Sequence, residues 1–229
     1  MMRAWFAFAV LVLPLLLQAG EYKSSLLVQT GEMKEHNLVV RNITDLGSNR
    51  TCLAFYVQTK GTSPVVRCYH AAEGFGASLF QVGHLKVDDL VIRKLDDTKN
   101  NMYCLVAYVS TPGTSPAVTC YPNTQRTKDN MVESGHLREG DLDIRKILDR
   151  GNNKICLVAY VRTKGTSPSV ACYDSIPDGK GGLYQTASLK EGDLVVRKIE
   201  DTAAATTCLV SYVSTPGTRS FLSCDQHKP

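Results

Sequence analysis

The chain repeats itself four times at a fixed interval of 52 residues. A period of this length without inserted segments is typical of propeller blades, solenoid units or tandem domains, in which each repeat is one supersecondary unit. We divide the chain into copies of approximately 21–72, 73–124, 125–176 and 177–229. The copies fill nearly all of the chain after residue 20, so we expect no separate catalytic domain. The repeat is marked most clearly by an apolar set, Leu38, Leu90, Leu142 and Leu194.

Residues 1–20 have the pattern of a secretory signal peptide. Arg3 is the only charge ahead of the apolar run 4–17, and the small residues Ala19 and Gly20 follow. The run is too short for a confident membrane span. We therefore expect signal cleavage after Ala19 or Gly20, a secreted or periplasmic chain, and no stable membrane span after cleavage; the alternative is an uncleaved N-terminal anchor.

Each copy is predicted to form β structure. In the third copy, 142–146 alternates apolar and polar side chains, and 156–161 and 168–173 are short runs rich in strand formers. Gly165 lies between these last two runs and can supply the positive φ of a hairpin turn. We expect three strands per copy, and a fourth from the segment near 79–82.

Two all-β architectures fit the repeats. A four-bladed β-propeller would use one copy per blade, and the unbroken period without linkers favours it. Two tandem β-sandwich or barrel domains of about 104 residues would use two copies each. The alternation of Thr-Lys-Gly-Thr in the odd copies with Thr-Pro-Gly-Thr in the even copies favours that second arrangement. We prefer the propeller as the working prediction, followed by the tandem domains and then by an open array of repeats.

The eight cysteines are predicted to form four structural disulfides, because eight cysteines in an exported chain are typical of a disulfide framework. They recur in pairs sixteen residues apart, and no Cys-x-x-Cys motif suggests zinc or redox chemistry. Repeat symmetry favours one connectivity among 105. It joins Cys52 to Cys68, Cys104 to Cys120, Cys156 to Cys172 and Cys208 to Cys224.

Four arginines at equivalent positions are the candidate binding residues. If the copies surround an axis, they would form a ring that attracts phosphate, sulfate or a carboxylate. The alternative is structural pairing with the acidic residues around the aspartates four positions further along, of which Asp149 is one. The candidates are Arg41, Arg93, Arg145 and Arg197.

Other chemistry is sparse. His84 and His136 occupy equivalent positions, but the other copies carry Glu32 and Ser188 there, so we assign no metal site. No nucleophile, base and acid pattern is visible, and we assign no catalytic residue and no cofactor. The net charge of +4 is too mild for a nucleic-acid footprint. Asn42 and Asn49 begin glycosylation sequons.

Part of each copy resembles a motif of small exported bacterial proteins. The resemblance lies in the runs 197–201, 208–212 and 167–172, which carry an Arg, an Asp and two cysteines that bracket a β-hairpin. It covers about 30 residues of each copy, implies a periplasmic or secreted setting, and supplies no catalytic residues. Those proteins usually have a single copy, so the resemblance leaves the fourfold architecture open.

The sequence favours a binding or structural module of the cell envelope or exterior over an enzyme. Its partner would be a protein, a glycan or a small anion. The alternative is a secreted hydrolase with its site in the segments between copies, which differ most among the repeats. These segments are 70–82, 122–134 and 174–186.

Overall fold

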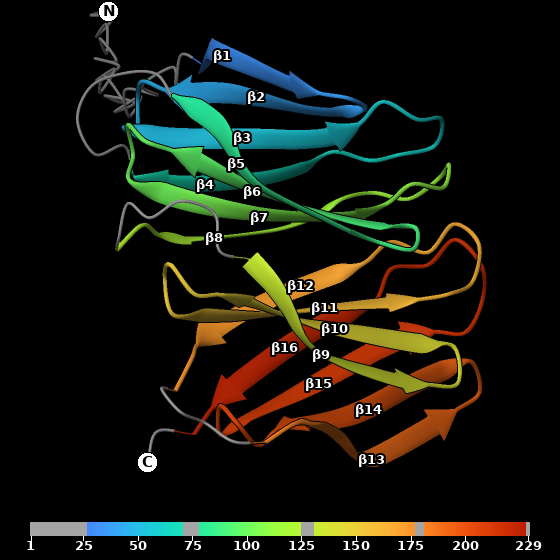
Figure 1. Ribbon diagram of the computed structural model, residues 1–229. Coiled ribbons are helices and arrows are strands. Elements are labelled where there is room, and N and C mark those ends of the chain that lie inside the picture. The colour runs from blue at the N-terminus through green and yellow to red at the C-terminus, as the bar shows by residue number, and fades with distance from the viewer. Residues whose placement is uncertain (1–26, 71–77, 125–130, 177–180, 228–229) are drawn as a thin grey trace, which may run out of the picture.

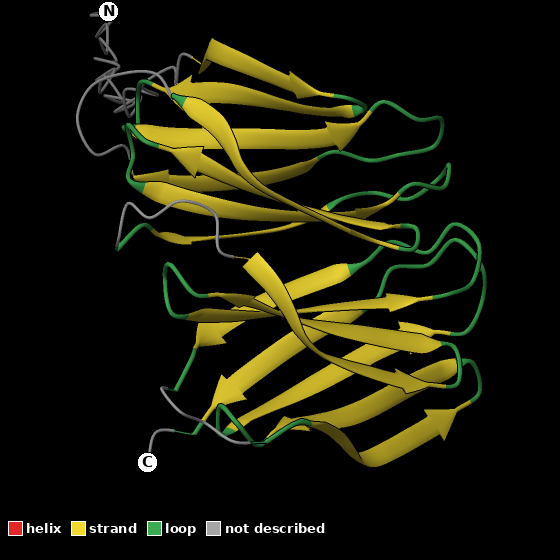
Figure 2. Ribbon diagram, viewed as in Figure 1, coloured by secondary structure: helices red, strands yellow, loops and turns green. Residues whose placement is uncertain are grey.

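The computed structural model describes residues 27–70, 78–124, 131–176 and 181–227. These residues contain sixteen β-strands and no helix (Figure 2). The expected signal peptide lies outside the described residues. Figure 1 shows the strands as four layers, which follow one another in chain order from blue to red.

Each layer is a four-stranded antiparallel sheet whose strands are neighbours in the order of the sequence. The first sheet has β1 (Leu27–Glu35), β2 (Leu38–Asp45), β3 (Arg50–Val57) and β4 (Val65–His70). The second has β5 (Leu79–Val87), β6 (Leu90–Asp97), β7 (Met102–Val109) and β8 (Ala117–Pro122). The third has β9 (Met131–Glu139), β10 (Leu142–Asp149), β11 (Lys154–Val161) and β12 (Ser169–Asp174). The fourth has β13 (Leu183–Glu191), β14 (Leu194–Asp201), β15 (Thr206–Val213) and β16 (Phe221–Gln226).

The register follows the alternation of the sequence. In the third sheet, Leu142 and Ile144 face the fourth sheet, whereas Ile147 packs with the second sheet. Cys156 lies opposite Cys172 across β11 and β12, as the hairpin prediction requires. The predicted fourth strand is also present in every repeat, where it is the first of the four. The prediction of four all-β repeats is therefore confirmed.

The hairpin tips of consecutive repeats stack against one another. Gly165 has a φ of 81°, the left-handed region in which glycine carries no steric cost. Gly113 N donates to Lys60 O at 3.0 Å, and Gly217 N donates to Lys164 O at 3.3 Å. The glycine thus serves both the turn and the close approach of neighbouring turns.

Three apolar cores hold the sheets face to face. The first core joins sheets one and two, with Phe55 and Val106 fully buried. The second joins sheets two and three around Leu105 and Val158, and the third joins sheets three and four. Because a core also joins sheets two and three, the stack continues across the boundary that would separate two tandem domains.

The sheets pack as propeller blades do, face to face and in sequence, but ring closure is not confirmed. Closure would need a fourth core between the first and fourth sheets. Among the described residues, the apolar cores join only consecutive sheets. The outward faces of the two end sheets are instead exposed, as Val66 on the first sheet and Leu209 on the fourth show, each of them 50% exposed.

Candidate functional site

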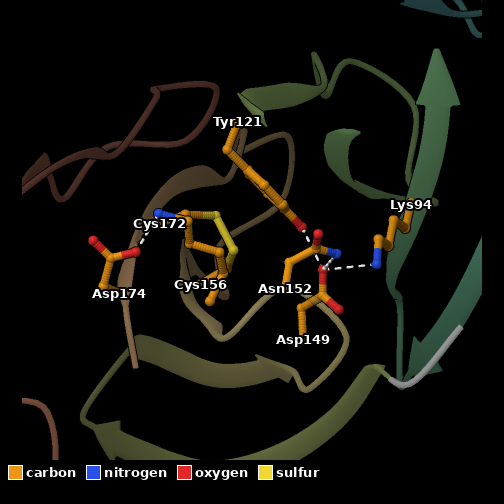
Figure 3. Close-up of a disulfide and its surroundings, with 8 residues drawn as sticks. Lys94, Tyr121, Asp149, Asn152, Cys156, Cys172 and Asp174 are labelled. Carbon is orange, nitrogen blue, oxygen red and sulfur yellow. Dashed lines mark hydrogen bonds and ion pairs between the residues drawn. A yellow bond between two sulfur atoms is a disulfide. The ribbon is translucent and has the colours of Figure 1, made fainter. Parts of the chain in front are cut away.

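A polar network is buried between the second and third sheets (Figure 3). Lys94 Nζ on β6 lies 2.7 Å from Asp149 Oδ2 on β10. The same oxygen accepts hydrogen bonds from Tyr121 OH and Asn152 Nδ2, both at 2.9 Å. A cation and two neutral donors therefore converge on one carboxylate oxygen, which offsets part of the cost of burying its charge.

The network recurs at the other two interfaces with one replacement in each, and between the third and fourth sheets Ala204 stands where Asn152 would be. Lys146 Nζ lies 2.7 Å from Asp201 Oδ2 on the fourth sheet, and Tyr173 OH donates to the same oxygen at 2.8 Å. Between the first and second sheets, Tyr69 donates to Asp97 in the same way. Asn42 stands where the lysine would be, and within the described chain its buried amide atoms have no hydrogen-bond partner. These networks are structural, because each lies between packed sheets.

Two of the predicted binding arginines, Arg93 and Arg145, also contact the preceding sheet. Arg145 is the most strongly held, because three carboxylates surround its guanidinium. Its Nε lies 2.9 Å from Asp143, its Nη1 lies 2.9 Å from Glu133, and its Nη2 lies 3.1 Å from Asp88 of the preceding repeat. A guanidinium that is already enclosed by carboxylates has little capacity for a further anion.

The other repeated arginines have fewer charged partners. Arg93 and Arg197 donate through Nε to Tyr108 and Tyr212 at 3.0 and 3.1 Å. Arg41, on the open face of the first sheet, lies 3.2 Å from Glu32, and its side chain is 45% exposed. Among the described residues, the hydrogen bonds and ion pairs of the four arginines link none of them to another. Anion binding by this set therefore stays a prediction.

The expected pairing of these arginines with the aspartates four positions further along is not what the structure shows. Arg145 and Asp149 lie on one strand, and four residues of strand span about 13 Å, too far for direct contact. Asp149 instead serves the interface network and caps its own turn through Asn152. The carboxylates that do meet Arg145 lie on its own sheet and on the preceding turn.

The four predicted disulfides are confirmed. Each joins the third strand of a repeat to the fourth. The described residues contain no free cysteine. Each fourth strand is an edge strand, so the disulfide fixes an edge that hydrogen bonds hold on one side only. The bonds are Cys52–Cys68, Cys104–Cys120, Cys156–Cys172 and Cys208–Cys224.

The candidate binding site is a groove across the fourth strands, with a volume of about 450 Å³. All four repeats line it. Arg67 comes from β4, Val118 from β8 and Val170 from β12, while Arg219 lies just before β16 and Phe221 begins it. A cavity of several hundred Å³ with a few charged groups over apolar walls has the size and chemistry of a small-molecule site.

The two groove arginines are the only ionisable residues in its described lining. Arg67 Nε donates to Val118 O at 2.9 Å, and Arg219 Nη2 donates to Pro116 O at 3.4 Å. Each contact is to a neutral carbonyl of the second repeat, so neither positive charge is neutralised there. The contacts orient the guanidinium groups while leaving the groove electropositive.

Sequence reasoning missed this pair. Arg67 has Thr119, Ala171 and Ser223 at its equivalent positions, and Arg219 stands where the other copies carry serine. The replacement at Arg219 is visible in the sequence, but neither arginine is among the predicted binding residues. The signal that could have found both residues is departure from the repeat, because residues that only maintain the stack recur in every copy.

The remaining predictions meet the structure only in part. His136 Nε2 lies 3.1 Å from Asp143, and the described residues contain no cluster of metal-ligating side chains. Within the same residues, no helix is long and apolar enough to cross a membrane.

The two glycosylation sequons differ in accessibility. Asn42 is buried and Asn49 is exposed, so only the second sequon is accessible. Within the segments of the hydrolase prediction, the stretches 71–77, 125–130 and 177–180 lie outside the described residues.

Comparison of the chain with protein-family models, with curated proteins and with solved structures gave no match. The description of this protein therefore rests on its own fold and candidate site. It is an all-β protein of four stacked sheets, each carrying one disulfide, and such disulfides are typical of oxidising, extracellular surroundings.

Proposed function

We propose that this protein is an exported binding module, and that the groove across its fourth strands holds an anionic group of its partner. The observation that carries the proposal is the pair Arg67 and Arg219 in a cavity whose described lining contains no acid. Arginine suits this task because its planar guanidinium binds carboxylate, sulfate or phosphate with two parallel hydrogen bonds.

The surrounding scaffold supports a binding role. Four disulfides and three apolar cores hold the edge strands that form the groove, so a ligand meets a site that is already formed. Ser169 and Ser220 lie in the lining, but their hydroxyls contact each other at 3.0 Å, and Ser220 also donates to Ala159 O at 3.0 Å. With the serines committed to the scaffold, the arginines are the groups that remain to recognise a ligand.

The test is a binding titration with two probes, a sulfated oligosaccharide and inorganic sulfate. Replacement of both Arg67 and Arg219 by alanine should weaken binding of the oligosaccharide by about tenfold or more, because hydrogen bonds to a charged group contribute about 1.5–3 kcal/mol each. The matched control is the pair Arg138→Ala and Lys190→Ala, which removes the same charge from exposed positions outside the groove. Equal loss in both double variants would show non-specific charge attraction and contradict the proposal.

A further variant distinguishes binding in the groove from binding by the repeated arginines. Arg41 is the member of that set on the open face of the first sheet, with a side chain that is 45% exposed. If Arg41→Ala abolished binding while the groove variant bound normally, the ligand site would lie on that face. A loss confined to the groove variant supports the site proposed here.

A further inference from the structure

The two end sheets present faces that are built like the faces buried inside the stack. On the fourth sheet, Leu194 (45% exposed) and Leu209 correspond by the repeat to Leu142 and Leu157, which are fully buried at the third interface. On the first sheet, Tyr56 and Val66 correspond to residues that pack in the first core. The end faces therefore retain much of the apolar surface of an interface without a sheet to cover it.

The ion pairs at these interfaces always run in the same direction along the stack, with the lysine on the earlier sheet and the aspartate on the later one. A lysine on the second strand of one sheet contacts the aspartate at the end of the second strand of the next sheet. Lys94 meets Asp149 in this way, and Lys146 meets Asp201, both at 2.7 Å. The next lysine in the series is Lys198, on the outward face of the fourth sheet.

The partner that Lys198 would take is present at the other end of the molecule. Asp45 holds the equivalent aspartate position on the first sheet, where no sheet precedes it. Its carboxylate already accepts hydrogen bonds from Gly47 N at 3.0 Å and Ser48 Oγ at 2.6 Å, which fix its orientation. Lys198 is 42% exposed and contacts Glu200 of its own strand at 2.9 Å. Lys198 and Asp45 are thus the lysine and the aspartate of one further ion pair of the same kind, and they lie at opposite ends of the molecule.

The two positions that depart from the repeat also match in charge. The internal interfaces use Tyr69, Tyr121 and Tyr173 to contact the aspartate of the next sheet, but the fourth repeat has Asp225 there. On the first sheet, Arg50 is the cross-strand neighbour of Asp45, at a position where the other repeats carry Met102, Lys154 and Thr206. The third repeat also carries a base at that position, Lys154, so the acid alone is new; it corresponds to a base on the other end face.

We infer that the outward face of the fourth sheet of one molecule packs against the outward face of the first sheet of a second copy, and so continues the stack from head to tail. Lys198 contacts Asp45 of the second copy, Asp225 contacts Arg50 of that copy, and Leu194 and Leu209 cover its apolar face. Because the two faces differ, the contact is heterologous and generates either a closed ring of molecules or an open filament.

Sedimentation velocity of the complete disulfide-bonded protein over a range of concentrations is the first test. We expect reversible association that strengthens with concentration. Lys198→Glu alone and Asp45→Lys alone should each weaken association about tenfold or more, because like charges then face each other at the contact. The double variant Lys198→Glu and Asp45→Lys should restore association, since the charges are exchanged. Arg138→Glu, on an exposed part of β9, is the control and should change nothing.

Two outcomes would overturn the inference. One is a monomer at every soluble concentration, which would mean that the end faces stay open or that they meet within one molecule to close a ring. The other is association that survives both single reversals, which would place the interface elsewhere. Leu209→Ser gives an independent check, because it weakens the proposed contact without changing charge and alters no residue of the groove lining.

Discussion

Lys94 of the second sheet and Asp149 of the third form an ion pair at 2.7 Å in which the side chains are 0% and 1% exposed. A buried pair of this kind is costly to break, because removing one partner leaves the other charge in the interior without compensation. The pair therefore couples the stability of two repeats that are joined mainly by side-chain packing.

Lys94→Met should lower the free energy of unfolding by about 3–5 kcal/mol. Lys198→Met is the matched control. It removes the equivalent but exposed lysine of the fourth repeat, and should cost no more than about 1 kcal/mol. Urea unfolding followed by circular dichroism measures both changes. Similar costs for the two variants would contradict the buried role of Lys94.

Asn42→Leu should stabilise the protein by about 1–2 kcal/mol. Asn42 is fully buried, and within the described chain both of its amide atoms have no hydrogen-bond partner, so an apolar side chain of similar size removes an uncompensated desolvation cost. Asn152→Leu is the opposite case, because Asn152 donates to Asp149 at 2.9 Å. It should destabilise the protein in the same urea assay. A destabilised Asn42→Leu variant would show that the amide is satisfied.

The stability should fall as the pH rises above about 10. Burial and the neighbouring carboxylates of Asp97, Asp149 and Asp201 raise the pKa values of Tyr69, Tyr121 and Tyr173 above the ordinary value. The unfolded chain releases these protons at about pH 10 while the folded chain keeps them, so the free energy of unfolding decreases above that pH.

Urea unfolding at pH 8 and at pH 10.5, with tyrosinate absorbance as a second probe, tests this pH dependence. Tyr121→Phe removes one of the three groups and should reduce the slope of stability against pH. A stability that is constant over this range would mean that the three hydroxyls ionise freely in the folded protein.

Removal of one disulfide should cost about 3 kcal/mol, because each closes a loop of similar length, with a sequence separation of 16. The paired replacement Cys156→Ala and Cys172→Ala should therefore cost about as much as the pair Cys104→Ala and Cys120→Ala. Thermal unfolding of the two variants makes the comparison. A loss confined to one repeat would show that local packing, not chain entropy, sets the contribution.

The repeat and its chemistry made much of the fold predictable from the sequence. Alternation in 142–146 placed Leu142 and Ile144 on one face, and the constant spacing of cysteines fixed Cys156 opposite Cys172. Both depend on contacts within one sheet, where the two-residue period of a strand determines which side chains share a face.

The contacts between sheets could not be read in the same way. Arg145 meets Asp88, a residue 57 positions away on a preceding turn, and nothing in the local pattern of either segment specifies that approach. The groove is harder still, because Arg67 and Arg219 come together only when strands 152 residues apart in sequence line one cavity. Stacking geometry, which a strand period does not encode, determines both.

The most direct test of the groove as a binding site is an NMR titration that observes the arginine Nε–Hε groups as a sulfated oligosaccharide is added. The account predicts saturable shifts at Arg67 and Arg219, with Arg93 and Arg145 unchanged because they are enclosed within the stack. Shifts at Arg41, Arg93, Arg145 and Arg197 with a silent groove would contradict it and return the site to the repeated arginines.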